Sequence, residues 1–255
     1  GSAVPLSNSS MNASEGCASI SDVNGALLFY TDGSTVYNQQ HIPMSNGSGL
    51  NGDATSTQSA IILQEPGSSS RYYIFTIDDN SGPDGLCYSI VDMSLLGGLG
   101  EVTSDKNIYV YSPIAEKVVA IKHQNGLDYW IVVQSATSDY YTYSLTASGI
   151  TNSTTPIISN GEVVTVAGSL KSNNDGNKIV NAFYQGTDSN GQTVTGFNIW
   201  DFDNTTGILS NSMIFNWGSP SQSNKTYGIE FSPSGDLLYI SAPYHEKIYQ
   251  YNLLA

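Results

Sequence analysis

The sequence predicts an all-β fold of the propeller class, and three observations support this. The 255 residues contain five copies of one pattern: a short strand, a polar turn ending near Gly, an apolar strand, a tip and an aromatic strand. The strands are rich in β-branched and aromatic residues with partial alternation. The first strands of the copies begin at residues 18, 59, 118, 168 and 227, and periods of about 40–50 residues are typical of propeller blades.

The last copy shows the pattern most clearly. Its strands are predicted at 228–231 (GIEF), 237–242 (LLYISA) and 247–253 (KIYQYNL), with a Pro and Gly turn at 232–235 between the first two. Three strands alone cannot bury both faces of a sheet. This copy therefore needs a neighbouring copy to stack against it.

We expect one domain over residues 1–255, with antiparallel blades of three to four strands at approximately 16–45, 57–112, 116–160, 166–218 and 226–254. Outer fourth strands are predicted at 106–111, 155–159 and 209–217, and none is identified in the first and last copies. Residues 3–7 (AVPLS) are a possible closing strand that would complete a five-bladed ring. The alternative is that the five repeats belong to a six- to seven-bladed ring.

Charge and cysteine content restrict the possible partners. Lys and Arg total 8 against 22 Asp and Glu, which gives a net charge of −14, and the single arginine is Arg71. Nucleic acid and anionic membranes are disfavoured, because few cations exist to neutralise phosphates. No apolar run is long enough for a membrane span. Cys17 and Cys87 are too few for a disulfide framework and are predicted to be buried free thiols.

Several segments resemble a known group of domains. EGCASISDVNGALLFYTDGSTVYN, GGLGEVT, EKVVAIKHQNGLDYWIVV, WDFDNTTG and YGIEFSPSGDLLYIS follow one another along the chain. They resemble the β-propeller domains, with WD40-like repeats, of Bacteroidetes cell-surface and secreted proteins linked to type IX secretion and gliding-type adhesins. The resemblance implies an extracellular or bacterial cell-surface location. A surface rich in Ser, Thr and Asn with only 12% charged residues is in keeping with that location.

Two groups of residues are candidate binding sites. Asp78, Asp79 and Asp84 lie within one oxygen-rich segment that could wrap a calcium ion, or form a solvated tip between two strands. Trp217, Tyr140, Tyr141 and Tyr244 are expected near tips, where they could form an aromatic sugar-binding surface or simply pack at blade edges. Trp130 and Trp200 lie within strands and are predicted to belong to the core between blades.

The predicted function is a non-catalytic interaction or adhesion module that binds a protein or glycan through its loops. A propeller-type hydrolase, either a lactonase or a glycosidase, is the alternative, and a structural spacer in a large adhesin is a third. Such a hydrolase needs paired acids or a metal at the inner ends of the first strands. The predicted first strands offer only Glu230, Lys122 and Lys171. We therefore expect no catalytic residue and no cofactor other than possible calcium.

Overall fold

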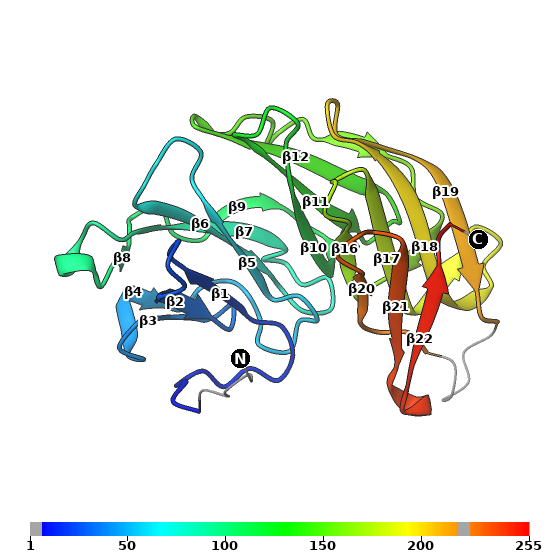
Figure 1. The fold of residues 1–255 in the computed structure, drawn as a ribbon, viewed down its shortest axis with the longest axis horizontal. Coiled ribbons are helices and arrows are strands. Elements are labelled where there is room, and N and C mark those ends of the chain that lie inside the picture. Colours follow the sequence, from blue (N-terminus) through cyan, green and yellow to red (C-terminus); the bar gives the residue numbers. More distant parts are fainter. Residues whose placement is uncertain (1–6, 219–224, 255) are drawn as a thin grey trace.

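The computed structural model describes residues 7–218 and 225–254. It is an all-β structure in which five blades of mainly antiparallel strands follow one another in chain order along an arc (Figure 1), and a parallel pairing of Ser45 with Glu101 joins the first two blades into one sheet. This confirms the predicted propeller class. Residues 3–6 of the possible closing strand lie outside the described residues, and Ser7 is not part of a strand.

The first three blades each contain four principal strands. Blade one comprises β1 (Ala18–Ser21), β2 (Leu27–Thr31), β3 (Thr35–Asn38) and β4 (Pro43–Ser48). Blade two comprises β5 (Ala60–Gln64), β6 (Arg71–Ile77), β7 (Leu86–Asp92) and β9 (Ile108–Tyr111). Blade three comprises β10 (Ile114–Lys122), β11 (Tyr129–Ser135), β12 (Tyr140–Thr146) and β14 (Ile157–Ser159).

Blade four has four principal strands and blade five has three. Blade four comprises β16 (Leu170–Ser172), β17 (Lys178–Asp188), β18 (Thr193–Asp203) and β19 (Ile208–Asn216). Blade five comprises β20 (Ile229–Phe231), β21 (Leu237–Ala242) and β22 (Lys247–Asn252). The remaining elements are the short strands β8 (Glu101–Val102), β13 (Gly149–Ile150) and β15 (Val163–Thr165), and the 3₁₀ turns η1 (Leu96–Gly98) and η2 (Pro243–His245).

The turn between the first two strands of each blade contains glycine, as predicted. All five of these glycines have a positive φ, which a residue with a side chain adopts only with strain. They are Gly25, Gly67, Gly126, Gly176 and Gly235. The three predicted outer strands are confirmed as β9, β14 and β19. The sequence did not reveal β4, the outer strand of blade one, because its sequence PMSNGS contains Pro and Gly and lacks β-branched residues.

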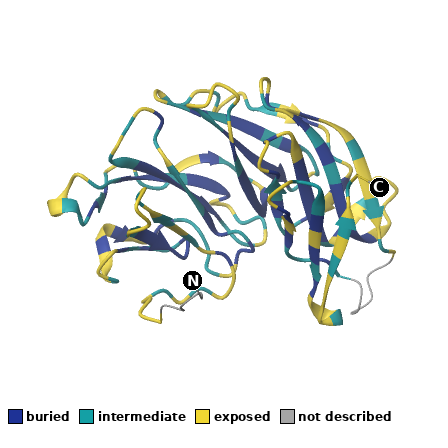
Figure 2. Cartoon of the chain, viewed as in Figure 1, coloured by how far each residue is buried: buried dark blue, intermediate teal, exposed yellow. Residues whose placement is uncertain are grey.

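In blades two to four, alternate residues of the central strand face the two neighbouring blades. On β6, Tyr72 and Ile74 pack with Phe29 of blade one, while Tyr73 and Phe75 pack with blade three. Buried residues therefore lie between successive blades as well as within them (Figure 2). The clusters between blades three and four include Trp130 and Trp200, as predicted for the core between blades.

The two ends of the arc are not joined by a sheet. Among the described residues no strand pairing connects blade one to blade five. A hydrogen bond from the Tyr227 hydroxyl to the Glu15 carboxylate connects the segments that lead into these two blades. The number of blades in a closed ring stays a prediction.

Two details differ from the sequence prediction. Strand β10 begins at Ile114 rather than at residue 118, so Glu116 and Lys117 belong to it. The pairing of β10 with β11 shifts register between Ile114 and Val118, and this irregularity interrupts the alternation that marks a strand. Both cysteines are free as predicted, but Cys17 is exposed and only Cys87 is buried.

Within the described part of the chain, no helix is long and apolar enough to cross a membrane.

Candidate active site

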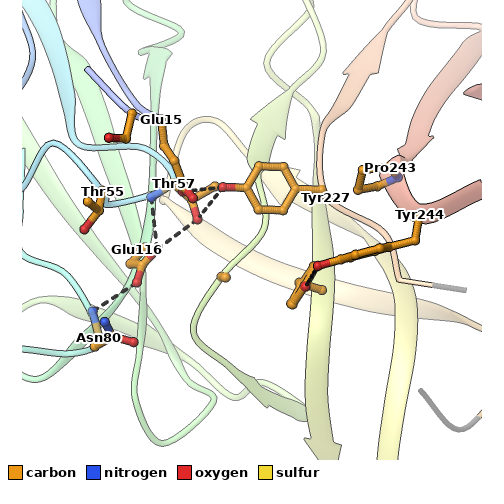
Figure 3. Close-up of a pocket in the computed structure, with 11 residues that line it drawn as sticks. Glu15, Thr55, Thr57, Asn80, Glu116, Tyr227, Pro243 and Tyr244 are labelled. Atoms are coloured by element: carbon orange, nitrogen blue, oxygen red, sulfur yellow. Dashed lines mark hydrogen bonds between the residues drawn. The ribbon is translucent and has the colours of Figure 1, made fainter. Parts of the chain in front are cut away.

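A pocket of about 730 Å³ lies where the inner strands of the blades begin. All five blades, or the segments leading into them, contribute to its lining (Figure 3). The lining residues are Ser14, Glu15, Thr55, Thr57, Asn80, Glu116, Ala167, Tyr184, Tyr227, Pro243 and Tyr244. Such convergence of loops at one end of the blades is where a propeller presents variable side chains on a rigid frame.

Glu116 is the buried carboxylate of the pocket, with only 5% of the residue exposed. Its Oε2 accepts hydrogen bonds from the Thr57 amide at 3.0 Å and the Thr57 hydroxyl at 2.9 Å. Its Oε1 accepts a hydrogen bond from the Asn80 amide at 3.0 Å. Glu116 of blade three thereby fixes two segments of blade two, the one that precedes β5 and the one that follows β6.

Tyr227 extends these contacts to the far end of the arc. Its hydroxyl donates to Glu15 Oε2 and lies 3.2 Å from the Thr57 hydroxyl oxygen. The Thr57 hydroxyl hydrogen is directed at Glu116, and the single Tyr227 hydrogen serves Glu15, so it reaches Thr57 only as a shared hydrogen. Burial and the contact with Glu15 raise the pKa of Tyr227, which therefore stays protonated and able to donate.

Each carboxyl group thus accepts from a hydroxyl, Glu15 from Tyr227 and Glu116 from Thr57, and the two hydroxyl oxygens lie 3.2 Å apart. Three donors meet Glu116, whereas Glu15 meets one donor and is exposed to the pocket. Oε1 of Glu15 makes no hydrogen bond within the described residues. The two carboxylates therefore differ in what they can do, since Glu116 is committed to the protein and Glu15 has an oxygen available to a ligand.

The tyrosines on the opposite side form a second group. The hydroxyls of Tyr184 and Tyr244 lie 2.7 Å apart, and their ring centroids are 6.2 Å apart. Tyr184 also meets Tyr227 edge to face, at 6.0 Å between centroids. Hydrogen bonding to Tyr184 raises the pKa of Tyr244. One hydroxyl hydrogen is used between the two phenols, so the pair retains a second one for a ligand.

The segment proposed for calcium lies beside this pocket. Asp78 uses both carboxylate oxygens within its own loop, accepting from the Asp79 amide at 2.9 Å and the Asp84 amide at 3.1 Å. Asn80 and Ser81 adopt left-handed backbone angles, with φ of 46° and 58°. The described residues contain no group of three or more His, Cys, Asp or Glu side chains placed to hold a metal. Calcium binding here stays a prediction, to be checked by thermal melting with added calcium.

The four predicted sugar-binding aromatics are not brought together. Tyr244 lines the pocket. Tyr140 is fully buried, and Tyr141 packs on Tyr111 of blade two at 4.6 Å between centroids. Trp217 packs between blades four and five, against Tyr249 at 5.0 Å. These residues therefore do not form a single surface.

Sequence reasoning missed Glu15, Thr57, Glu116, Tyr184 and Tyr227 as members of one site. All but Tyr184 lie just before or near the start of an inner strand. The repeats are recognised by the apolar residues of their strands, so the polar residues before these strands do not stand out. The available signal was positional, because the residue preceding the inner strand faces the same end of every blade. Glu116 was missed as a site residue because the sequence predicts that the first strand of the third copy begins at residue 118.

Comparisons with known proteins support the fold. No family model matches the chain, and no curated protein sequence matches it. Hydrazine synthase from Kuenenia stuttgartiensis is similar in structure over 92% of this chain and 64% of that chain, with 14% identity and a TM-score of 0.55. The periplasmic gluconolactonase PpgL from Pseudomonas aeruginosa is similar over 92% of this chain and 65% of that chain, with 11% identity and a TM-score of 0.55.

A third solved structure is the calcium structure of a family AA12 carbohydrate-active enzyme from Trichoderma reesei. It is similar over 91% of this chain and 79% of that chain, with 12% identity and a TM-score of 0.54. The chain spans just under two thirds of the length of the hydrazine synthase and gluconolactonase chains. Because the sequence identities are this low, the structural similarity shows a shared propeller fold and nothing more. None of these comparisons supports the Bacteroidetes secretion or gliding-adhesin assignment.

The expectation of a non-catalytic adhesion module is wrong. Among the solved structures that share the fold is a gluconolactonase, and this favours the propeller-hydrolase alternative. The chemical argument against an enzyme is wrong as well, because it considered only residues inside the predicted first strands. The structure places Glu116 in β10, and Glu15 joins it in one pocket from outside any strand.

Proposed function

We propose that the protein is a hydrolase of the lactonase type, whose active site is the pocket that contains Glu15 and Glu116. The observation that carries this proposal is the pair of carboxyl groups in one pocket, each held by one of two adjoining hydroxyls, those of Tyr227 and Thr57. General acid–base hydrolysis needs one group that can take and return a proton near a water molecule. Glu15 is suited to this role, because its Oε1 is open to the pocket.

A lactone is a cyclic ester, and its hydrolysis needs no more than proton transfer and stabilisation of charge on oxygen. Glu15 takes a proton from water, and the resulting hydroxide attacks the carbonyl carbon. The ring C–O bond then breaks, and the proton passes from Glu15 to the departing ring oxygen, so that a hydroxy acid is released. Tyr227 holds Glu15 through its other oxygen, Oε2.

The developing negative charge on the carbonyl oxygen needs a donor. The hydroxyls of Tyr184 and Tyr244 are 2.7 Å apart and hold one hydrogen more than their mutual contact uses. That hydrogen is available to the carbonyl oxygen from the side opposite Glu15. Glu116 acts as a positioning residue, since it fixes Thr57 and Asn80 by their backbone amides.

A secreted or cell-surface location is part of this proposal. It is supported by the low share of charged residues, 12%, and by the periplasmic origin stated for the gluconolactonase that shares the fold. The partner is then a small carbohydrate-derived substrate.

The test is hydrolysis of D-glucono-1,5-lactone, followed by acid release and corrected for spontaneous hydrolysis. We expect Glu15→Gln to lower kcat/KM by at least about 100-fold, the usual contribution of a general base. Glu101→Gln is the matched control, because Glu101 lies in β8 and contacts Ser45 instead of the pocket. Equal rates for Glu15→Gln and the wild type, or no acceleration of any lactone by the wild type, would refute the proposal.

A further inference from the structure

The pocket has two chemically different walls. Blades one to three contribute carboxylate, hydroxyl and amide groups, among them Glu15, Thr57 and Asn80, whereas Tyr227 and Tyr244 come from blade five (Figure 3). Blade four adds Tyr184 to the second wall. One wall is therefore acidic and accepts hydrogen bonds, and the other is aromatic. A ligand that fits between them needs an apolar face on one side and hydrogen-bond donors on the other.

The aromatic wall has a ring available for contact. Tyr244 is 52% exposed, although its hydroxyl is engaged with Tyr184. Its neighbour Tyr184 is in turn held edge to face by Tyr227. The C–H face of a sugar ring packs on such an exposed phenol, while the hydroxyl groups at the ring edge donate to carboxylates.

The charge of the pocket opposes an anionic ligand. None of the described residues that line it is Lys or Arg, and residues 219–224, outside the described residues, contain neither. The cation in contact with the pocket's tyrosines is Lys225, whose Nζ lies 4.3 Å from the ring centroid of Tyr184 and 5.6 Å from that of Tyr244. Against this single cation stand two carboxylates in the pocket and a net charge of −14 on the chain.

We infer that the pocket selects an uncharged, polyhydroxylated ring and rejects phosphorylated or carboxylated forms of the same ring. The inference rests on the proposed function for the statement that this ring is a lactone. The selection itself depends only on the two walls and on the charge of the pocket. It therefore applies equally to a ring that is bound without being hydrolysed.

Binding of a non-hydrolysable analogue separates recognition from catalysis. The probes are D-glucono-1,5-lactam and its 6-phosphate, each titrated calorimetrically into the intact protein. The phosphorylated lactam should bind at least about tenfold more weakly. The repulsion between like charges a few ångströms apart in a protein is large enough to lower the affinity by more than a factor of ten. About 0.5 M NaCl, which shortens the screening length, should narrow this difference. Glu15→Gln should narrow it too.

The aromatic wall is tested by two substitutions of one residue. Tyr244→Leu removes the ring and should weaken lactam binding by about tenfold, a typical loss for a stacked aromatic. Tyr244→Phe keeps the ring and should bind the lactam within about threefold of the wild type. Tyr239→Leu is the control, because Tyr239 lies in β21, is 37% exposed and does not line the pocket.

The outcomes distinguish this inference from the proposed function. Equal or tighter binding of the phosphorylated lactam would overturn the inference, and loss of that binding in Lys225→Met would identify Lys225 as an anion site. Equal effects of Tyr244→Leu and Tyr239→Leu would also overturn it. If the lactam binds with the expected selectivity but no lactone is hydrolysed, the inference stands and the lactonase proposal fails.

Discussion

Glu116 and Lys117 are adjacent on strand β10, yet their side chains serve two different regions of the molecule. Glu116 faces the pocket and contacts backbone amides of blade two. Lys117 is fully buried between blades three and four, where its Nζ donates to Asn181 Oδ1 at 2.8 Å and to the Ala182 carbonyl at 2.7 Å. Burial lowers the pKa of Lys117 well below its ordinary value, and the neighbouring Glu116 carboxylate opposes this shift.

The difference lies in how each charge is satisfied. The contacts of Lys117 are all in the interior. Its Nζ also donates to the Thr165 hydroxyl at 3.5 Å, and Asn181 donates to Tyr140 at 2.8 Å and to Gln134 at 3.2 Å, so five side chains share one closed network. At the pocket the network ends at Glu15, which has an oxygen left over. A buried charge with closed contacts stabilises the way two blades fit together, whereas an open end allows a ligand to complete the network.

The largest expected effect is in the closed network. Asn181→Ala removes an acceptor of Lys117 and the donor to Tyr140 and Gln134, all in the interior. Because a buried charge and two buried polar groups lose partners, we expect a loss of about 3 kcal/mol in the free energy of unfolding. Urea denaturation measures it, with the exposed turn residue Asn190→Ala as control. A loss no larger than that of Asn190→Ala would show that the network contributes little.

A smaller effect is expected at the pocket. Glu116→Gln keeps the shape of the side chain but places an amide NH₂ against donors from Thr57 or Asn80. We expect a loss of about 2 kcal/mol, the value of hydrogen bonds to one charged group. Hydrogen exchange at the amides of Thr57 and Asn80 should accelerate, while the Asn181 amide in the neighbouring blade should not change. Equal acceleration of exchange at the pocket amides and at the Asn181 amide would contradict the distinction between the two regions.

The comparison also shows what the sequence could and could not predict. The five glycine turns and the strands they join followed from local chemistry, because a positive φ and an alternating apolar pattern are properties of a few consecutive residues. The pocket did not follow from local chemistry. Tyr227 and Glu15 are 212 residues apart and meet only because the arc brings blades one and five toward each other. Lys117, read as a residue before a strand, gave no sign of complete burial.

The contact between the two ends of the arc should contribute less than either network. Tyr227→Phe removes the hydroxyl that reaches Glu15 and Thr57 but keeps the ring against Tyr184. Because the site is half exposed and water can replace the lost partner, we expect a loss of about 1 kcal/mol in unfolding free energy. Tyr249→Phe is the matched control, because it removes a hydroxyl that bonds to His245 within the same blade. A loss above that for Glu116→Gln would make the closure of the arc the dominant contact.

The smallest effect is expected where a charge is satisfied entirely within one turn. Asp203 ends β18 at the face of the blades opposite the pocket, and its carboxylate accepts from the Thr205 amide at 2.9 Å and the Thr206 hydroxyl at 2.8 Å. Hydrogen bonds from Thr205, its hydroxyl first and then its amide, hold the pKa of Asp203 at about 2 against an ordinary value of 3.8. A pKa lowered by folding means that the unfolded chain binds the proton more readily.

The stabilisation by Asp203 is therefore present above the unfolded pKa and is lost as the pH falls toward about 2. Asp203→Asn should lower the melting temperature slightly near neutral pH, and the difference from the wild type should shrink as the pH falls through that window. Asp175→Asn is the control, because the Asp175 carboxylate makes no hydrogen bond within the described residues. If the difference in melting temperature instead grows on acidification, the fold stabilises the protonated form of Asp203. That outcome would contradict the prediction, because the contacts in this turn are donors to the carboxylate. Because the effect stays within one turn, it should also leave the exchange rates at Thr57 and Asn181 unchanged.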